Sequence, residues 1–366
     1  MKDHNIAKIC FVGDYDPLYI RNAVIIDGLK ATGIEWTECH SPKKTSVRLF
    51  DLATAYLKQG RGADMVLVVS SDTSRWIVAL MKLLTLGRKP LVWDAHYSIF
   101  DSYINDRKLA PLYSIKGAYY WFIDWMACTL ADVILLDTNA HVQYFVDTFY
   151  TNKKKFVRVF VGSNMIKTFG IPERTRNDSD FLVSFHGKYI PLQGIQYILR
   201  AAKILEQFSD IRFKLVGSGQ TYNEMRALAE ELQLSNVEFT KKVPYQEIPG
   251  FLKNADVSLG IFAGTDKAQR VIANKIYEAV ELGVPVITSD SPGIRELFTD
   301  RKDILLCRPA DPDDLAAKIL ELRNDAALRS TIAAQALRLF EERVTPKEIG
   351  EQLIGDLKSK LAMHPI

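Results

Sequence analysis

Short apolar runs alternate with helical patterns along the whole chain. In the first half, the runs that predict strands span residues 7–12, 63–69, 90–93, 131–136 and 156–161. In the second half, they span residues 181–185, 213–216, 237–239, 257–261, 284–288 and 304–306. Each run is continuous and rich in Val, Ile, Leu and Phe, which is typical of strands buried on both faces. Strand–helix–strand repetition therefore predicts an α/β protein with parallel sheets and right-handed crossovers.

A residue pair that recurs between these runs predicts that the chain has two similar halves. An Ala-Asp pair recurs at Ala63-Asp64, Ala131-Asp132 and Ala255-Asp256, each time closing a helix before a strand. The polar stretch at residues 163–180 contains a proline and fits a linker, and the pattern after Asp311 is helical nearly to the end. A chain of 366 residues also suits two domains better than one. The expected divisions are 1–165, 166–342 and a final helix at 343–366 that packs back toward the first domain.

Composition narrows the class of protein. The hydrophobic fraction of 48% and the charged fraction of 25% are ordinary for a soluble globular protein, and a net charge of +3 argues against a nucleic-acid-binding polycation. The four cysteines form no CxxC pair, so we expect neither a zinc site nor a disulfide framework. The start of the chain lacks a signal-peptide pattern and no run of eighteen apolar residues occurs. We therefore expect a cytoplasmic protein.

The common nucleotide-binding motifs are missing from the loops that follow the predicted strands. In open α/β sheets ligands bind at these loops, outside the carboxyl ends of the strands. The loop at residues 11–22 has only Gly13, and the loop after residue 216 has Gly217 and Gly219 without a third glycine. No P-loop pattern is present either. A dehydrogenase or a P-loop NTPase is therefore disfavoured.

The stretch at residues 271–287 predicts a short helix followed by a buried strand. Asn274, Lys275 and Glu278 would share one helical face, because residues three and four apart are neighbours on a helix. Lys267 and Arg270 come just before this helix. A helix N-terminus with cations beside it is suited to an anion, and a sugar diphosphate would use both. Glu278 could accept hydrogen bonds from ribose hydroxyls.

The order of these motifs resembles that of the family 4 retaining glycosyltransferases. The loop with Gly187 and Lys188, the glycine loop at Gly217 and the stretch NKIYEAVELGVPVITSDSPGIREL follow the family's order, and the similarity is strongest over residues 184–308. The resemblance implies the GT-B architecture, in which two Rossmann-like domains face each other across a cleft. Residues 1–165 would then form the acceptor-side domain, and residues 166–342 the nucleotide-sugar donor domain.

The resemblance also implies roles for individual residues. Glu278 would bind the nucleotide ribose, Lys188 the diphosphate, and the segment around Val243 the base. His96, directly after the strand at residues 90–93, would contact the donor sugar. The expected catalytic residues are therefore His96 at the sugar, Lys188 at the diphosphate and Glu278 at the ribose. The full expected donor-binding set is Gly13, Gly187, Lys188, Gln193, Gly217, Val243, Lys267, Arg270, Asn274, Lys275 and Glu278.

The implied activity is the retaining transfer of a hexosyl group from a nucleoside diphosphate sugar, UDP- or GDP-linked, to an acceptor hydroxyl. It would serve glycan, polysaccharide or glycolipid synthesis, with a carbohydrate or lipid-linked acceptor, no nucleic acid and no cofactor. No Asp-x-Asp metal motif occurs in a donor loop, so we expect no metal ion. Two positions depart from the family pattern: Arg270 stands where many members have glutamate, and Gln193 where many have lysine.

Other interpretations of the same residues stay open. A nucleotide-sugar epimerase of GT-B fold and a non-catalytic nucleotide-sugar-binding protein share the architecture, and Arg270 is the best support for the second. Lys275 and Glu278 could be a surface ion pair, Lys188 an exposed loop lysine and His96 a structural histidine. His186 has no evident role beyond packing or capping.

One N-terminal segment has two explanations. Residues 108–132 combine many aromatic side chains with Lys108 and Lys116, a mixture that suits a membrane interface. The simpler alternative is a helix buried against the N-terminal sheet. Peripheral contact with the inner membrane face is therefore kept as a hypothesis, and the oligomeric state is left open.

Overall fold

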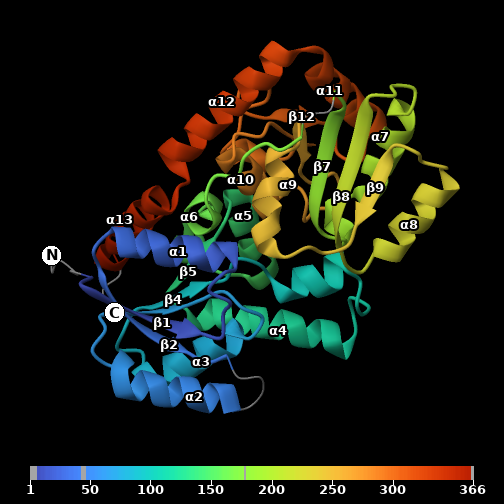
Figure 1. Cartoon of the computed structure of the whole chain (residues 1–366). Helices are drawn as coiled ribbons and strands as arrows, with labels where there is room; N and C mark the ends of the chain where they lie inside the picture. The colour runs from blue at the N-terminus through green and yellow to red at the C-terminus, as the bar shows by residue number, and fades with distance from the viewer. Residues whose placement is uncertain (1–5, 43–46, 177–178, 364–366) are drawn as a thin grey trace. The chain divides into compact units, whose positions relative to one another are not determined.

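The chain forms two compact units in the computed structural model, which describes residues 6–42, 47–176 and 179–363 (Figure 1). The first unit comprises Met1–Gly162 and Val344–Ile366, and the second comprises Ser163–Arg343. Parts of the expected domains and linker, at residues 1–5, 43–46, 177–178 and 364–366, lie outside the described residues.

The first unit is built on a six-stranded parallel sheet with the strand order β2-β1-β3-β4-β5-β6. Its strands are β1 (Lys8–Gly13), β2 (Glu35–His40), β3 (Met65–Val68), β4 (Leu91–Asp94), β5 (Val133–Leu136) and β6 (Phe156–Arg158). Its α-helices are α1 (Ile20–Ala31), α2 (Val47–Ala55), α3 (Ser74–Thr85), α4 (Ile115–Leu130), α5 (Asn139–Phe149) and α13 (Pro346–Met363). Shorter helical segments span Tyr56–Gly60, Asp101–Asp106 and Lys153–Lys155.

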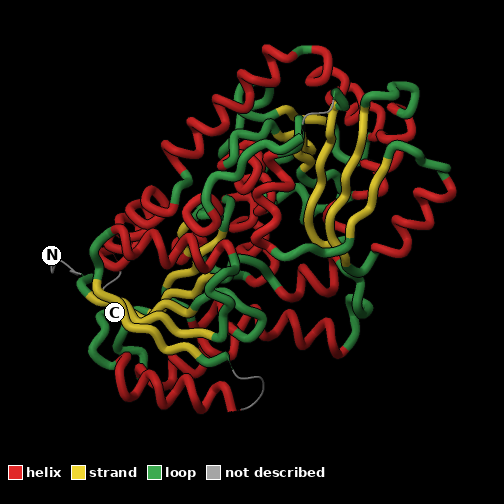
Figure 2. The backbone as a smooth tube through the Cα atoms, viewed as in Figure 1, coloured by secondary structure: helices red, strands yellow, loops and turns green. Residues whose placement is uncertain are grey.

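The second unit repeats the design with the strand order β12-β11-β10-β7-β8-β9, again all parallel. Figure 2 shows the strands of the two units in yellow, among helices in red. Its strands are β7 (Phe181–Lys188), β8 (Ile211–Ser218), β9 (Val237–Thr240), β10 (Val257–Leu259), β11 (Val286–Ser289) and β12 (Leu305–Cys307). Its α-helices are α6 (Met165–Phe169), α7 (Ile195–Leu205), α8 (Tyr222–Glu231), α9 (Ile248–Lys253), α10 (Asn274–Glu281), α11 (Pro312–Asn324) and α12 (Ala326–Arg343). Short 3₁₀ turns span Pro191–Gln193, Tyr245–Glu247 and Ile294–Glu296.

The α/β class and the eleven predicted strands are confirmed, with ends shifted by at most three residues. The strand that the sequence did not predict is β2, whose residues EWTECH are mostly exposed or half-buried. It lies at the edge of its sheet, so it lacks the continuous apolar run by which the buried strands were found.

The repeated Ala-Asp pair joins neighbouring strands. The backbone N–H of Asp132 donates to the carbonyl of Leu91, at the start of β4, and the Asp132 carboxylate accepts the N–H of the same residue, each at 2.9 Å. Asp256 makes the same closed pair with Leu182 of β7, and Asp64 with Lys8 of β1. The motif therefore fixes the amino-terminal edge of each sheet, away from the loops that could bind a ligand.

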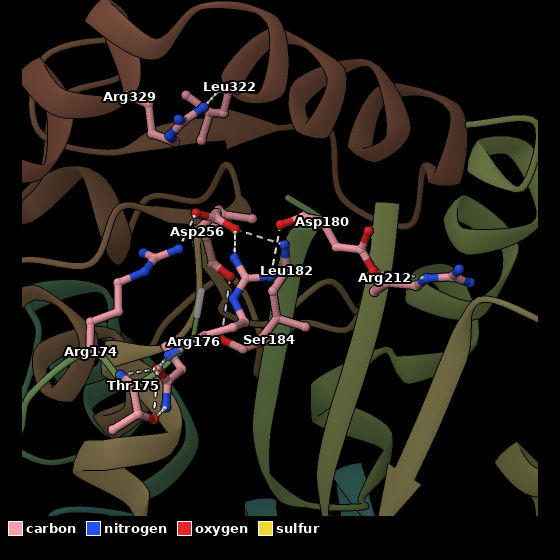
Figure 3. A network of polar contacts seen from close by, with 12 residues as sticks. Arg174, Thr175, Arg176, Asp180, Leu182, Ser184, Arg212, Asp256, Leu322 and Arg329 are labelled. Atoms are coloured by element: carbon pink, nitrogen blue, oxygen red, sulfur yellow. Dashed lines mark hydrogen bonds and ion pairs between the residues drawn. The ribbon is translucent and has the colours of Figure 1, made fainter. Parts of the chain in front are cut away.

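Asp256 is also the centre of a wider network (Figure 3). It accepts hydrogen bonds from Arg174, at 2.8 Å, and from Arg176. The backbone N–H groups of Thr175 and Arg176 donate to Asn254. This part of the expected linker is thus bonded into the second unit.

The helix α13 packs against α1 within the first unit. The two helices approach at Gly28 and Gly350, since a Cβ built on Gly28 would lie 2.9 Å from the backbone of Gly350. The contact leaves no space for a side chain at either position. No helix within the described ranges is long and apolar enough to cross a membrane.

Candidate functional site

The sheet of the second unit reverses its strand order between β7 and β10. The chain runs from β7 outward through β8 and β9, and then returns to β10 on the other side of β7. Ligands of open α/β sheets bind in the crevice outside the carboxyl ends of the strands at such a switch point. The end of β7, the loops that leave β7 and β10, and the helix α10 together carry eight of the eleven predicted donor residues.

Glu278 is a buried carboxylate on α10 that is held by two partners. Its Oε2 lies 2.6 Å from Nε2 of His186, and the Tyr245 hydroxyl donates to its Oε1 at 2.7 Å. Burial favours a raised pKa, but the hydrogen bonds from His186 and Tyr245 and the nearby Lys275 outweigh it, so the pKa of Glu278 is lowered. Glu278 is therefore an ionised acceptor whose orientation is fixed.

Lys275, one turn before Glu278, is buried beneath the loop that ends β7. Its Nζ donates to Oε1 of Gln193 at 2.6 Å and lies 3.5 Å from the ring centroid of Phe185. Burial lowers the pKa of Lys275 well below its usual value, while Glu278 acts in the opposite direction. A Cβ on Gly187 would come within 2.9 Å of this Nζ, so the lysine amine lies directly against the Gly187 backbone.

The ends of β7 and β8 approach each other too closely for side chains. Gly187 and Gly217 have φ values of +142° and +145°, which favour glycine. A Cβ on Gly217 would lie only 1.9 Å from the carbonyl oxygen of Gly187. The two strand ends therefore pack backbone against backbone, with Gly217 buried and Gly187 half-buried at the carboxyl edge of the sheet.

Four other predicted donor residues lie at or before the start of α10 or at the end of β7. Within the described chain, no side chain caps the helix at Ala273, so the first N–H groups of α10 are not satisfied by a capping residue. Asn274, Lys267 and Arg270 are half-buried at or before this turn, and Lys188 is exposed at the end of β7. Cations at a helix N-terminus favour an anion there.

The structure thus gathers two groups of residues around α10, one at Lys275 and one at Glu278. Gly187, Gln193 and Lys275 form one, and Glu278 with His186 and Tyr245 forms the other. Half-buried Val243 lies in the loop after β9, two residues before Tyr245. Sequence analysis gave no role to His186 and did not single out Tyr245, because neither is close to Glu278 in the sequence.

Gly13 lies in the first unit, where that sheet reverses between β1 and β3. The next residue, Asp14, bridges the reversal, since its Oδ1 accepts hydrogen bonds from Ser71 at 2.5 Å and Thr73 at 2.7 Å. Arg48 forms an ion pair with the same carboxylate. Polar groups therefore gather at this switch point too.

His96 follows β4 in a left-handed conformation, with φ of +53°. Such a conformation is uncommon for a side-chain-bearing residue, and it often marks a functional position. The Nε2 of His96 lies 3.1 Å from the Tyr19 hydroxyl, whereas its buried Nδ1 has no hydrogen-bond partner among the described residues.

Two buried ionic pairs lie near the ring of His96. Arg21 and Asp94 are fully buried and 2.8 Å apart, and His141 is 2.7 Å from Asp137. Burial, followed by the charge of Arg21, lowers the pKa of His96 to about 4. The imidazole is therefore neutral near pH 7 and can exchange hydrogen bonds without carrying charge.

The described residues include no evident cluster of metal ligands. No group of three or more His, Cys, Asp or Glu side chains among them is arranged to hold a metal ion. Lysine and arginine side chains and the start of α10 are the positive groups in this region.

Comparison with known proteins finds that this chain is similar to glycosyltransferases. Residues 167–338 match the family model described as glycosyl transferases group 1. An uncharacterized glycosyltransferase of Methanocaldococcus jannaschii is 26% identical over 220 residues, which cover 60% of this chain and 56% of that protein. A putative colanic acid biosynthesis glycosyltransferase of Salmonella typhimurium is 28% identical, over 46% of this chain and 42% of its own length. These matches support the GT-B glycosyltransferase family. The chain spans about half the length of these curated relatives.

Solved structures show the same fold. The Anabaena protein HepE, crystallised with UDP and glucose, superposes with a TM-score of 0.69 at 17% identity, over 96% of this chain and all of HepE. Sucrose-phosphate synthase from Thermosynechococcus elongatus gives a TM-score of 0.71 at 16% identity, covering 97% of this chain and 99% of its own. The predicted GT-B fold is therefore confirmed.

Proposed function

We propose that this protein is a retaining glycosyltransferase that moves a hexosyl group from a nucleoside diphosphate sugar to an acceptor hydroxyl. The observation that carries the proposal is the α10 arrangement, in which an ionised Glu278 and a buried Lys275 lie one turn apart beside the bare backbone of Gly187. A carboxylate that could accept from ribose hydroxyls and an amine against the half-buried backbone of Gly187 suit the two halves of a nucleoside diphosphate.

UDP-glucose is the first donor to test. HepE, which shares this fold, has been crystallised with UDP-glucose. Val243 and its neighbours would line the base, Glu278 would bind the ribose, and Gly187, Lys188, Arg270 and the start of α10 would bind the diphosphate. Two relatives are named for colanic acid and lipopolysaccharide core biosynthesis, which favours a glycan or glycolipid acceptor.

Catalysis would rest on charge stabilisation at the leaving diphosphate. Negative charge grows there as the sugar departs, and fixed cations and N–H groups stabilise it without reorganising. Retention is explained by front-face attack, in which the acceptor hydroxyl passes its proton to the leaving phosphate. His96, whose imidazole is neutral near pH 7, would contact the donor sugar.

Arg270 supports a second candidate, a nucleotide-sugar-binding protein without transferase activity. It stands where many family members have glutamate, so a carboxylate of the family pattern is replaced by a cation. An epimerase is the third candidate, and it would need an acid and a base around the sugar.

Donor binding and product analysis together test the proposal. A thermal-shift screen against UDP-, GDP- and ADP-sugars should identify the donor, because a ligand at a hundred times its Kd adds about 2.7 kcal/mol of stability. The identified donor is then incubated with an acceptor panel, and products are separated by mass and anomeric configuration. A retained glycoside supports the proposal. Epimerised sugar nucleotide without acceptor, or tight binding without any transfer, would replace it with one of the other candidates.

A further inference from the structure

A band of large apolar side chains lies exposed on α4 and the turn before it. The band consists of Leu112, Tyr113, Ile115, Tyr119, Phe122 and Trp125, and is called here the α4 face. Tyr113 is 96% exposed and Ile115 is 91% exposed, and the other four are exposed by 36–46%. Trp76 of α3 extends the band, since its Nε1 lies 3.4 Å from the Tyr119 hydroxyl.

These apolar side chains are exposed although α4 itself is packed against the first unit. Its opposite side, with Gly117, Ile123, Asp124 and Ala127, is buried against the first unit. Ile115, Tyr119 and Phe122 recur at helical spacing, so they form one continuous stripe. A large contiguous apolar patch on a folded protein marks an interaction site.

Along α4 and the turn before it, the exposed charges are positive. In residues 107–130, all of which the structure describes, the exposed charged side chains are Lys108 and Lys116. The carboxylate of this stretch, Asp124, is fully buried and paired with Arg75 at 2.8 Å. Tyr and Trp side chains favour the boundary between water and hydrocarbon, because each has an apolar body and a polar tip.

We propose that the α4 face binds an anionic lipid surface, with α4 lying in the plane of the interface. An apolar stripe bordered by lysines is the pattern of helices that lie on membranes, and the cations complement anionic headgroups. This inference does not depend on the proposed sugar transfer, so each can fail separately.

Vesicle sedimentation with the full chain tests the inference. The protein should sediment with vesicles of phosphatidylcholine and phosphatidylglycerol, more weakly with phosphatidylcholine alone, and less as salt rises. The double variant Phe122→Ser/Trp125→Ser should lower the partition coefficient at least about tenfold, since it removes two large apolar contacts. Lys116→Gln should lower it about fivefold on the anionic vesicles and not on the neutral ones.

Phe50→Ser is the matched control, because Phe50 is 70% exposed on α2 of the same unit. It should bind vesicles as the wild type does, and circular dichroism should show unchanged helix content in every variant. Failure of the wild type to bind anionic vesicles would overturn the inference, as would equal loss in the Phe50→Ser control. Self-association of the wild type that the double variant abolishes, without vesicle binding, would instead assign the face to a contact between copies.

Discussion

Glu278 and Lys275 lie on the same turn of α10, but burial acts on them in opposite ways. Glu278 keeps its charge because His186, Tyr245 and Lys275 compensate for lost water. Lys275 has a neutral amide partner in Gln193, and burial therefore favours its uncharged form. In the proposed site, one residue is ready to bind hydroxyl groups, while the other would gain charge only when an anion arrives.

Replacing Glu278 with Gln should weaken donor binding while leaving the fold intact. Hydrogen bonds to a charged group contribute about 1.5–3 kcal/mol, so we expect Kd for the nucleoside diphosphate to rise about ten- to a hundredfold. Isothermal titration calorimetry measures it. Glu247→Gln, at an exposed residue of the turn that carries Tyr245, should leave Kd unchanged. An unaltered Kd in a folded Glu278→Gln variant would remove Glu278 from the donor site.

Donor binding should take up protons through Lys275. A diphosphate beside the amine favours its charged form and raises its pKa, so the protonated fraction of Lys275 should rise on binding. Calorimetry near pH 8 in buffers of different ionisation enthalpy should reveal this uptake. Lys275→Met should lose both the uptake and some affinity. Uptake that persists in the variant would assign the protons to another group.

His96→Ala should lower turnover about ten- to a hundredfold while nucleoside diphosphate affinity changes little. The loss corresponds to about 1.5–3 kcal/mol for a contact made to the reacting sugar. Because the pKa of His96 is lowered to about 4, its protonation changes little between pH 6 and 8. Wild type and His96→Gln should therefore give parallel pH profiles in that range. A lost nucleotide affinity with normal turnover would contradict this role for His96.

At the scale of elements, sequence patterns predicted the strands and helices that depend on residues close together in the chain. Continuous apolar runs revealed the buried strands, and the spacing of Asn274, Lys275 and Glu278 predicted α10. The edge strand β2 was missed because edge residues need not be apolar. Tyr245 was missed because its contact with Glu278 spans 33 positions and exists only after β9 and α10 are folded. The burial of Lys275 has the same origin, since Phe185 and Gln193 come from distant segments.

The Ala-Asp motif should contribute measurable stability. Asp256→Asn removes a charged acceptor from Leu182, Arg174 and Arg176, and should lower the free energy of unfolding by about 1.5–3 kcal/mol in urea titrations. Burial opposes ionisation of Asp256, but the N–H of Leu182 and the two arginines lower its pKa overall. Its contribution is thus present above the unfolded pKa of about 3.9 and lost as pH falls through the folded pKa.

The difference between wild type and Asp256→Asn should accordingly narrow as pH is lowered below about 4. Glu341→Gln, at an exposed residue of α12, serves as the control and should cost little at any pH. A difference that stays constant down to pH 3 would show that the carboxylate charge is not what stabilises the sheet edge.

For the whole molecule, the cations of the proposed diphosphate site predict that the rate of sugar transfer is unchanged by EDTA. The proposed site offers Lys188, Lys267, Arg270 and Lys275 to a diphosphate, which replaces the charge that a divalent ion would supply. Initial rates of transfer should be the same with and without the chelator. Magnesium-loaded EDTA controls for effects of the chelator itself. A rate that EDTA abolishes and Mg²⁺ or Mn²⁺ restores would contradict this prediction.

The packing of α13 on α1 makes the first unit discontinuous in sequence, with Ser163–Arg343 inserted between its two parts. During synthesis, the surface of α1 around Gly28 emerges long before Gly350 can cover it. At ~5–20 residues per second, the ribosome needs roughly 10 to 40 s to produce the inserted segment Ser163–Arg343 alone. The second unit can fold within that interval, whereas the first must wait with an uncovered helix. A newly made chain is therefore most exposed to aggregation and chaperone binding at α1, and removal of residues 344–366 would make that transient state permanent.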